Sequence, residues 1–95
     1  MSQQSHLRPV GHDDKMADVD LVLSKVRAEV ERAMLKHKPL NSAHEAWAVI
    51  REELDELWDE VKGDNGYTLA AFTEAEQVAA MAVRYIVDLA DRVEL

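Results

Sequence analysis

The residues best suited to chemistry in this chain lie in one segment, HEAWAVIREELDELWDEV, which spans residues 44–61. It holds seven carboxylates in eighteen residues, placed between tryptophan, leucine, isoleucine and valine. Carboxylate oxygens are hard ligands of the kind that Mg²⁺ prefers. The segment is therefore either a solvated acidic helix face or part of a metal site, and the direction in which each acid points decides between the two.

The acids of this segment separate into two groups when it is drawn as a helix that turns about 100° per residue. Glu53 lies about 20° beyond the edge of the apolar arc, and Glu56, three positions on, shares its surface. Asp55 and Asp59 lie on the opposite side, towards water. No Lys or Arg stands three or four residues from Glu53, so a divalent cation would supply the charge that offsets repulsion between Glu53 and Glu56.

A second polar pair with the same spacing, Glu74 and Gln77, borders an apolar face further along the chain. That apolar face consists of Ala75, Val78, Ala82, Tyr85, Leu89 and Val93. The polar border continues with Met81, Arg84 and Asp88. If the two helices pack antiparallel, the two polar borders meet and enclose a cleft, as in the carboxylate sites of helical bundles.

Three helices are predicted to position these residues. Apolar residues recur every three or four positions from Val19 to Met34, which predicts a first helix over residues 14–36, before Pro39. Capping-box patterns, Ser or Thr followed three residues later by Glu, predict the starts of the other two helices. The second helix is expected over residues 42–62, with Asn41 or Ser42 as its cap and Glu45 completing the pattern for Ser42. The third is expected to start near Thr73 and to run over residues 73–93.

The fold class predicted from this pattern is all-α, because no strand-like alternation and no internal repeat occur and the chain holds only 3 Gly and 2 Pro. Residues 1–15 are polar and lack periodicity, so we expect a flexible N-terminal arm. Residues 16–95 are expected to form one helical domain. A domain of that size buries a modest fraction of its surface, so burial between subunits would stabilise it.

Charge and composition exclude several classes of partner. The net charge is −8 and no basic stripe is visible, which argues against a nucleic-acid polymer but leaves open a nucleotide bound through divalent cations. No apolar run is long enough to cross a membrane. The first fifteen residues lack the apolar core of a secretory signal, so the cytoplasm is the expected location. The absence of cysteine excludes thiolate metal sites.

The segment HEAWAVIREELDELWDEVK, followed by EAEQVAAMAVRYIVDL, resembles the MazG-like all-α nucleoside triphosphate pyrophosphohydrolases, especially the short single-domain members of bacteria and phages. The resemblance covers about residues 36–89. The family motif is Glu-x-x-Glu on one helix and Glu-x-x-Asp on the next. Glu53 and Glu56 match the first pair and Glu74 begins the second, but Gln77 stands where the family usually has Asp.

The resemblance implies a helical bundle completed by homodimerisation or homotetramerisation. It implies hydrolysis of a nucleoside triphosphate, NTP or dNTP, to the monophosphate and pyrophosphate with Mg²⁺, or with Mn²⁺ in its place. The implied metal ligands are Glu53, Glu56, Glu74 and Gln77. Glu52 would be the acid that orients the attacking water. Because a neutral amide is a weaker Mg²⁺ ligand than a carboxylate, Gln77 leaves open one metal instead of two, weak activity or no activity.

Arg84 and Lys38 are the candidate substrate-binding residues, since both are cations near the expected cleft. Each has an alternative role: Arg84 could pair with Asp88 four residues on, and Lys38 follows a helix C-terminus, where cations are favoured anyway. Trp47 and Trp58 are interpreted as core or subunit-interface residues rather than as residues that stack on a nucleobase.

Two other classes of function remain open from the sequence. One is a catalytically silent helical binding module that keeps the fold without the second metal-binding carboxylate. The other is an acidic module that binds a basic partner through the outward acids Asp55 and Asp59. Cation binding separates the first from an enzyme, and mutation of the outward acids identifies the second.

Overall fold

The computed structural model describes residues 12–94, which form three α-helices and one short 3₁₀ helix. The helices are α1 (His12–Lys36), α2 (Ala43–Asp64) and α3 (Leu69–Leu89), followed by η1 (Ala90–Arg92). Within this described range there is no strand. The predicted all-helical class with three main helices is therefore confirmed.

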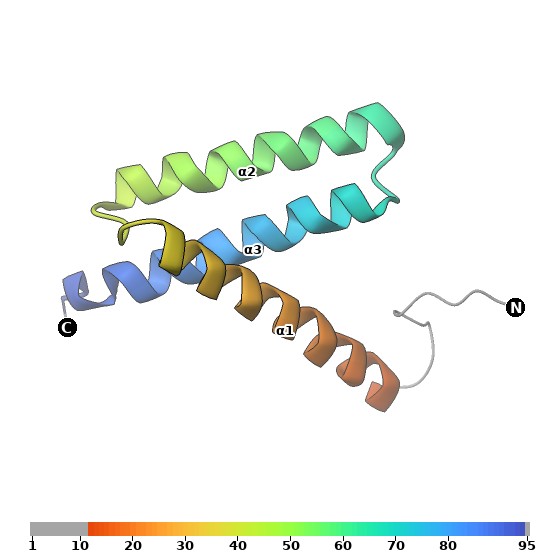
Figure 1. Ribbon diagram of the computed structural model, residues 1–95, viewed down its shortest axis with the longest axis horizontal. Coiled ribbons are helices and arrows are strands. Elements are labelled where there is room, and N and C mark those ends of the chain that lie inside the picture. Colours follow the sequence, from red (N-terminus) through yellow and green to blue (C-terminus); the bar gives the residue numbers. More distant parts are fainter. Residues whose placement is uncertain (1–11, 95) are drawn as a thin grey trace, which may run out of the picture.

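The third helix is the centre of the fold, because α3 packs against both α1 and α2 whereas these two make no comparable contact with each other. In Figure 1, α2 and α3 run antiparallel and side by side, and α1 crosses α3 at a steep angle. The N-terminal half of α1 diverges from the other helices in this view. Only the C-terminal half of α1 is therefore placed to contribute side chains to a site between α2 and α3.

The first helix begins earlier than predicted. It starts at His12 rather than Asp14, so residues 12–15, assigned from sequence to the arm, form its first turn. Asp13 and Asp14 lie in that turn, where a negative charge interacts favourably with the positive end of the helix dipole. The remainder of the expected arm, residues 1–11, lies outside the described residues.

The second helix begins with the capping arrangement predicted from sequence. Ser42 is the N-cap, and its Oγ accepts a hydrogen bond from the Glu45 backbone N–H at 3.1 Å. The Glu45 carboxylate reaches back to accept from the Asn41 backbone N–H at 2.7 Å. The helix ends at Asn65, which has a left-handed backbone with φ of 55°, and Gly66 follows at φ of 86°.

The prediction that α3 starts at Thr73 is wrong. The N-cap is Thr68, whose Oγ1 accepts from the Ala71 backbone N–H at 3.1 Å, so Thr73 lies inside the helix. Both threonines had the chemistry of a cap, but Thr68 directly follows the turn at Asn65 and Gly66. The chain can therefore enter the helix at once, and Leu69 to Phe72 add a turn to it.

The face of α3 that packs inside the chain is shifted from the predicted apolar face towards the predicted polar border. The buried residues of α3 are Ala71, Ala80, Met81, Arg84 and Leu89; Met81 and Arg84 belong to that border, whereas Leu89 belongs to the predicted apolar face. Ala75, Ala82 and Tyr85 are exposed instead. One core cluster joins α1 and α3 through Val26, Ala33, Ala80 and Met81. A second cluster joins α2 and α3 to the connector between α1 and α2 (residues 37–42) through Leu40, Ala46 and Leu89. Burial of the polar border brings its functional groups towards α1 and α2.

Candidate functional site

The centre of the candidate site is a group of three carboxylates on α2. Glu52, Glu53 and Glu56 each offer an oxygen, and these oxygens lie within 4.8 Å of one another. Adjacent and i, i+3 positions bring the three side chains to one surface because a helix completes a turn in about 3.6 residues. Glu53 is partly buried, while Glu52 and Glu56 are exposed.

The antiparallel packing of α2 and α3 adds a fourth carboxylate. Partial removal of Glu74 from water raises its pKa, and the neighbouring Glu56 raises it further through its charge and a side-chain hydrogen bond. Glu56 of α2 and Glu74 of α3 therefore lie close enough to interact, as the antiparallel arrangement predicts for the two polar borders.

Glu53 is the most strongly perturbed acid of the group. Partial burial, followed by the charges of Glu56 and Glu74, raises the pKa of Glu53 to about 7. Perturbed acids of this kind concentrate at functional sites, although structural clusters also produce them. Repulsion among the clustered acids thus outweighs the positive charge nearby, and a bound cation would relieve it.

The geometry of the donors fits a hard divalent cation. Mg²⁺ takes an octahedron of oxygens at about 2.0–2.1 Å, which puts adjacent ligand atoms about 2.9 Å apart and opposite ones about 4.2 Å apart. The oxygens of Glu52, Glu53 and Glu56 lie within 4.8 Å of one another, so side-chain rotations that draw them closer would form such a site. Carboxylate and water ligands suit Mg²⁺ and Mn²⁺ better than softer metals.

A pocket of about 410 Å³ lies next to these acids. Glu52 and Glu53 line it from α2, and Gln77 and Arg84 line it from α3. Its apolar lining includes Ala33, Leu40, Val49 and Met81. A cleft of this size with a mixed polar and apolar lining is within the range of small-molecule sites. Glu56 and Glu74 do not line it, so the acid cluster lies at one side of the pocket.

Gln77 contacts a residue of α1 that the sequence did not single out. Glu29 accepts two hydrogen bonds from Arg32, three residues further along α1, and Gln77 lies close enough to help lower the pKa of Glu29. The hydrogen bonds from Arg32 are the main reason why the pKa of Glu29 is lowered. The Glu29–Arg32 spacing was the only signal in the sequence, and such pairs are common on solvated helices.

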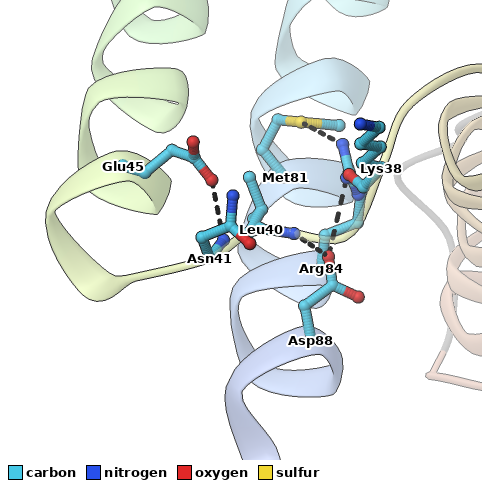
Figure 2. Close-up of polar contacts among 7 residues, drawn as sticks. All are labelled: Lys38, Leu40, Asn41, Glu45, Met81, Arg84 and Asp88. Carbon is cyan, nitrogen blue, oxygen red and sulfur yellow. Dashed lines mark hydrogen bonds and ion pairs between the residues drawn. The ribbon is translucent and has the colours of Figure 1, made fainter.

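Arg84 holds the connector between α1 and α2 against α3. Its guanidinium donates to the Lys38 carbonyl at 3.0 Å and forms an ion pair with Asp88 at 3.5 Å. Asp88 in turn accepts from the Leu40 backbone N–H at 2.9 Å. Figure 2 shows these contacts as one network beside Met81, whose sulfur also accepts from Arg84. The Arg84–Asp88 alternative is thus what the structure contains, and the role of Arg84 in binding substrate stays a prediction.

We call this network the connector clasp (Lys38, Leu40, Arg84 and Asp88). Its ion pair is almost fully buried, with the Arg84 and Asp88 side chains 3% and 8% exposed. The connector itself forms one wall of the pocket. Lys38 is exposed and lines that wall, next to His37. The clasp therefore fixes the wall on which the candidate phosphate-binding lysine lies.

The two tryptophans lie away from the pocket. Trp47 is 55% exposed and Trp58 is 57% exposed, so neither is a core residue of the described chain, and the subunit-interface interpretation remains. Trp47 lines a shallow groove with Ala43, His44 and Tyr85. His44 is exposed and lies outside the acid group, in agreement with a surface role.

Comparisons with known proteins add no relative. No protein-family model, no curated protein and no solved structure matches the chain. In the described part of the chain, none of the helices combines the length and the apolar character that a membrane span requires.

Proposed function

We propose that this protein is a Mg²⁺-dependent nucleoside triphosphate pyrophosphohydrolase of the MazG-like type. The observation that carries the proposal is the meeting of Glu52, Glu53 and Glu56 within 4.8 Å, with Glu74 against them from α3, beside a pocket of about 410 Å³. Such a site suits a polyphosphate because the substrate and the acids carry the same sign of charge, and divalent cations bind both.

In this mechanism Glu53, Glu56 and Glu74 would hold the cation, and Glu52 would accept a proton from the attacking water. The water oxygen bonds to the α-phosphorus as the bond to the pyrophosphate oxygen breaks, which yields the monophosphate and pyrophosphate. A bound Mg²⁺ would supply positive charge for the phosphate oxygens and lower the pKa of water. Gln77 offers an amide oxygen only, so the proposal requires no second carboxylate at that position. The expected location of such an enzyme is the cytoplasm.

The test is pyrophosphate release from a panel of ordinary and modified NTPs and dNTPs with Mg²⁺ or Mn²⁺. The Glu53→Gln, Glu56→Gln double variant removes two donors and should lose at least about 100-fold in kcat/KM, because removing groups that hold a catalytic metal removes its transition-state stabilisation. The matched control is Asp55→Asn, Asp59→Asn, which removes the same charge from the exposed opposite side of α2. Unchanged pyrophosphate release in the Glu53/Glu56 variant would rule the assignment out.

A silent binding module is the second candidate, and the contact between Gln77 and Glu29 favours it. The amide of Gln77 interacts with Glu29 of α1, so this side chain has a role in the fold that needs no metal. Calorimetric titration with Mg²⁺ and Mn²⁺, with and without nucleotide, separates the candidates. The enzyme must bind one of these ions in the millimolar range or more tightly, and the silent module binds neither.

Self-association is part of the proposal because large apolar side chains remain exposed on every helix. Those on α1 include Met16, Val19 and Leu23; those on α2 are Trp47, Leu54 and Trp58; those on α3 include Phe72, Tyr85 and Ile86. Apolar surface on this scale is unusual for a monomer. We propose that a homodimer or homotetramer covers it.

A further inference from the structure

Arg32 is the exposed arginine of the pocket. The other basic side chains in the lining are His37, Lys38 and Arg84, and Arg84 is buried in the connector clasp. The Arg32 side chain is 55% exposed and comes from the C-terminal half of α1. It lies close enough to Glu53 for that carboxylate to raise the pKa of Arg32, after the larger effect of Glu29. A fixed cation thus stands beside the acid cluster on the pocket side.

Glu29 holds the Arg32 guanidinium in a two-point contact. Nε donates to one carboxylate oxygen of Glu29 at 3.1 Å, and one terminal nitrogen donates to the other oxygen. Glu29 is itself only 15% exposed. A two-point contact of this kind fixes the plane of a guanidinium as well as its position. The second terminal nitrogen of Arg32 makes no hydrogen bond to the residues between 12 and 94, so it can donate to a ligand.

The side chain of Gln77 helps to hold Glu29 in its position beside Arg32. The Gln77 side chain lies close enough to Glu29 to lower the pKa of that carboxyl, which a carboxylate at position 77 could not do unless it were protonated. An aspartate there would instead repel Glu29 and weaken its hold on Arg32. Gln77, which stands where the MazG-like family usually has Asp, is therefore chemically complementary to Glu29 on α1.

We propose that Arg32 binds a phosphate oxygen of the substrate, and that Glu29 and Gln77 are positioning residues that orient its guanidinium. The inference rests on the proposed function and adds to it a phosphate contact supplied by α1. Arginine suits this role because a planar guanidinium can bind carboxylate along one edge and phosphate along another. Lysine would keep the charge but could not make both contacts in fixed geometry.

The experiment measures binding of inorganic tripolyphosphate by calorimetry in saturating Mn²⁺, and binding of Mn²⁺ alone, for the full chain and its variants. Arg32→Gln should weaken tripolyphosphate binding by about 10- to 100-fold, as expected for loss of a charge-assisted hydrogen bond. Mn²⁺ alone should bind as tightly as in the wild type, or more tightly, because a positive charge has left the neighbourhood of Glu53. Arg32→Lys should recover part of the loss.

The positioning role is tested through kinetics with the best nucleotide substrate. Gln77→Asp and Glu29→Gln should each raise KM about 5- to 20-fold with kcat little changed, because a misdirected Arg32 weakens substrate binding equally in the ground and transition states. If position 77 acts only as a metal ligand, Gln77→Asp tightens Mn²⁺ binding and leaves KM unchanged, which overturns the positioning role.

Arg51→Gln is the matched control, since Arg51 is an exposed arginine paired with Asp55 away from the pocket. Wild-type tripolyphosphate affinity in Arg32→Gln overturns the inference while leaving the enzyme assignment intact. A wild-type protein that neither takes up Mn²⁺ nor hydrolyses any nucleotide overturns both.

Discussion

At the residue scale, Glu53 joins the electrostatics of the site to the stability of the fold. Its pKa is raised from 4.5 to about 7 in the folded protein. An acid with a raised folded pKa disfavours the folded state once it ionises, so its unfavourable contribution is absent below about pH 4.5 and grows until about pH 7. As the pH rises from about 4.5 to about 7, ionisation of Glu53 should therefore lower the stability of the wild-type protein.

The first prediction follows from the upward direction of the Glu53 pKa shift. Glu53→Gln cannot ionise, so at pH 8 without divalent cations it should be more stable than the wild type by on the order of 1–3 kcal/mol, and the difference should vanish below about pH 4.5. Urea denaturation at several pH values measures it. Adding Mn²⁺ should reverse the order at pH 8, since only the wild type binds the ion well. A pH-independent difference between the two proteins would contradict the assignment of the raised pKa to Glu53.

A second residue-scale prediction concerns the turn between α2 and α3. Gly66 has φ of 86°, and a Cβ there would lie 3.0 Å from Val61 Cγ2, whereas a Cβ on Gly63 meets nothing within 4 Å. Gly66→Ala should cost about 1–2 kcal/mol because the left-handed conformation is unfavourable for an L-residue with a side chain. Gly63→Ala should stabilise by about 0.4–1 kcal/mol. Thermal denaturation of the two variants should show shifts of opposite sign.

At this scale the sequence was informative about individual acids and much less about their neighbours. The spacing of Glu53 and Glu56 identified a shared surface, because helix geometry alone determines which residues lie together. Glu29 and Arg32 were missed because their contact with Gln77 depends on how α1 crosses α3, and no local pattern encodes that crossing. For Arg84, the sequence pointed to the ion pair with Asp88 but not to the hydrogen bond to the Lys38 carbonyl, and its role in binding substrate stays a prediction.

At the element scale, the connector clasp determines where the pocket wall lies. Asp88 is 8% exposed and serves both Arg84 and the Leu40 backbone N–H. Asp88→Asn leaves an uncompensated buried guanidinium, which should cost about 2–4 kcal/mol. Denaturation with guanidinium chloride or urea measures this loss of folding stability. The exposed Asp91→Asn should lie within about 0.5 kcal/mol of the wild type, and an equally small effect at Asp88 would show that the clasp contributes little.

The elements also show which signals in the sequence were sufficient. The start of α2 was predicted correctly because, of the two candidate caps, Asn41 and Ser42, only Ser42 has a Glu three residues later to complete a capping box. The start of α3 was not, because Thr68 and Thr73 both have the chemistry of a cap and only the preceding turn distinguishes them. Packing, rather than hydrophobic periodicity, decided which face of α3 is buried, since the helix is apolar over more than one face.

At the scale of the whole molecule, the exposed apolar surface predicts self-association. Trp58→Glu adds a charge to that surface, so it should weaken association at least about 10-fold, because burying an unpaired charge is strongly unfavourable. Sedimentation equilibrium over a range of concentrations measures it. Ala48→Glu adds the same charge on the exposed outward side of α2 and should not change the mass. A wild-type protein that remains monomeric at high micromolar concentration would contradict this prediction.

The wide apolar arcs of α2 and α3 explain why sequence alone predicted the fold class but not the packing. Each arc is broad enough to serve two surfaces, one inside the chain and one facing outward. The single-chain fold uses the edge that carries Glu53, Met81 and Arg84, and leaves the edge with Trp47 and Tyr85 exposed. Periodicity cannot assign either edge to a particular neighbour, because both edges repeat every three or four residues.

The connector clasp also has a consequence for chain entropy. It joins positions 46 and 48 residues apart, Lys38 to Arg84 and Leu40 to Asp88, in a chain without cysteine. Closing a loop of that length from an unfolded chain is costly. The short α2–α3 turn removes most of this cost, because forming that antiparallel hairpin already brings the start of α2 to the end of α3. The clasp therefore becomes a local step once the hairpin exists, and it directs α1 back onto α3.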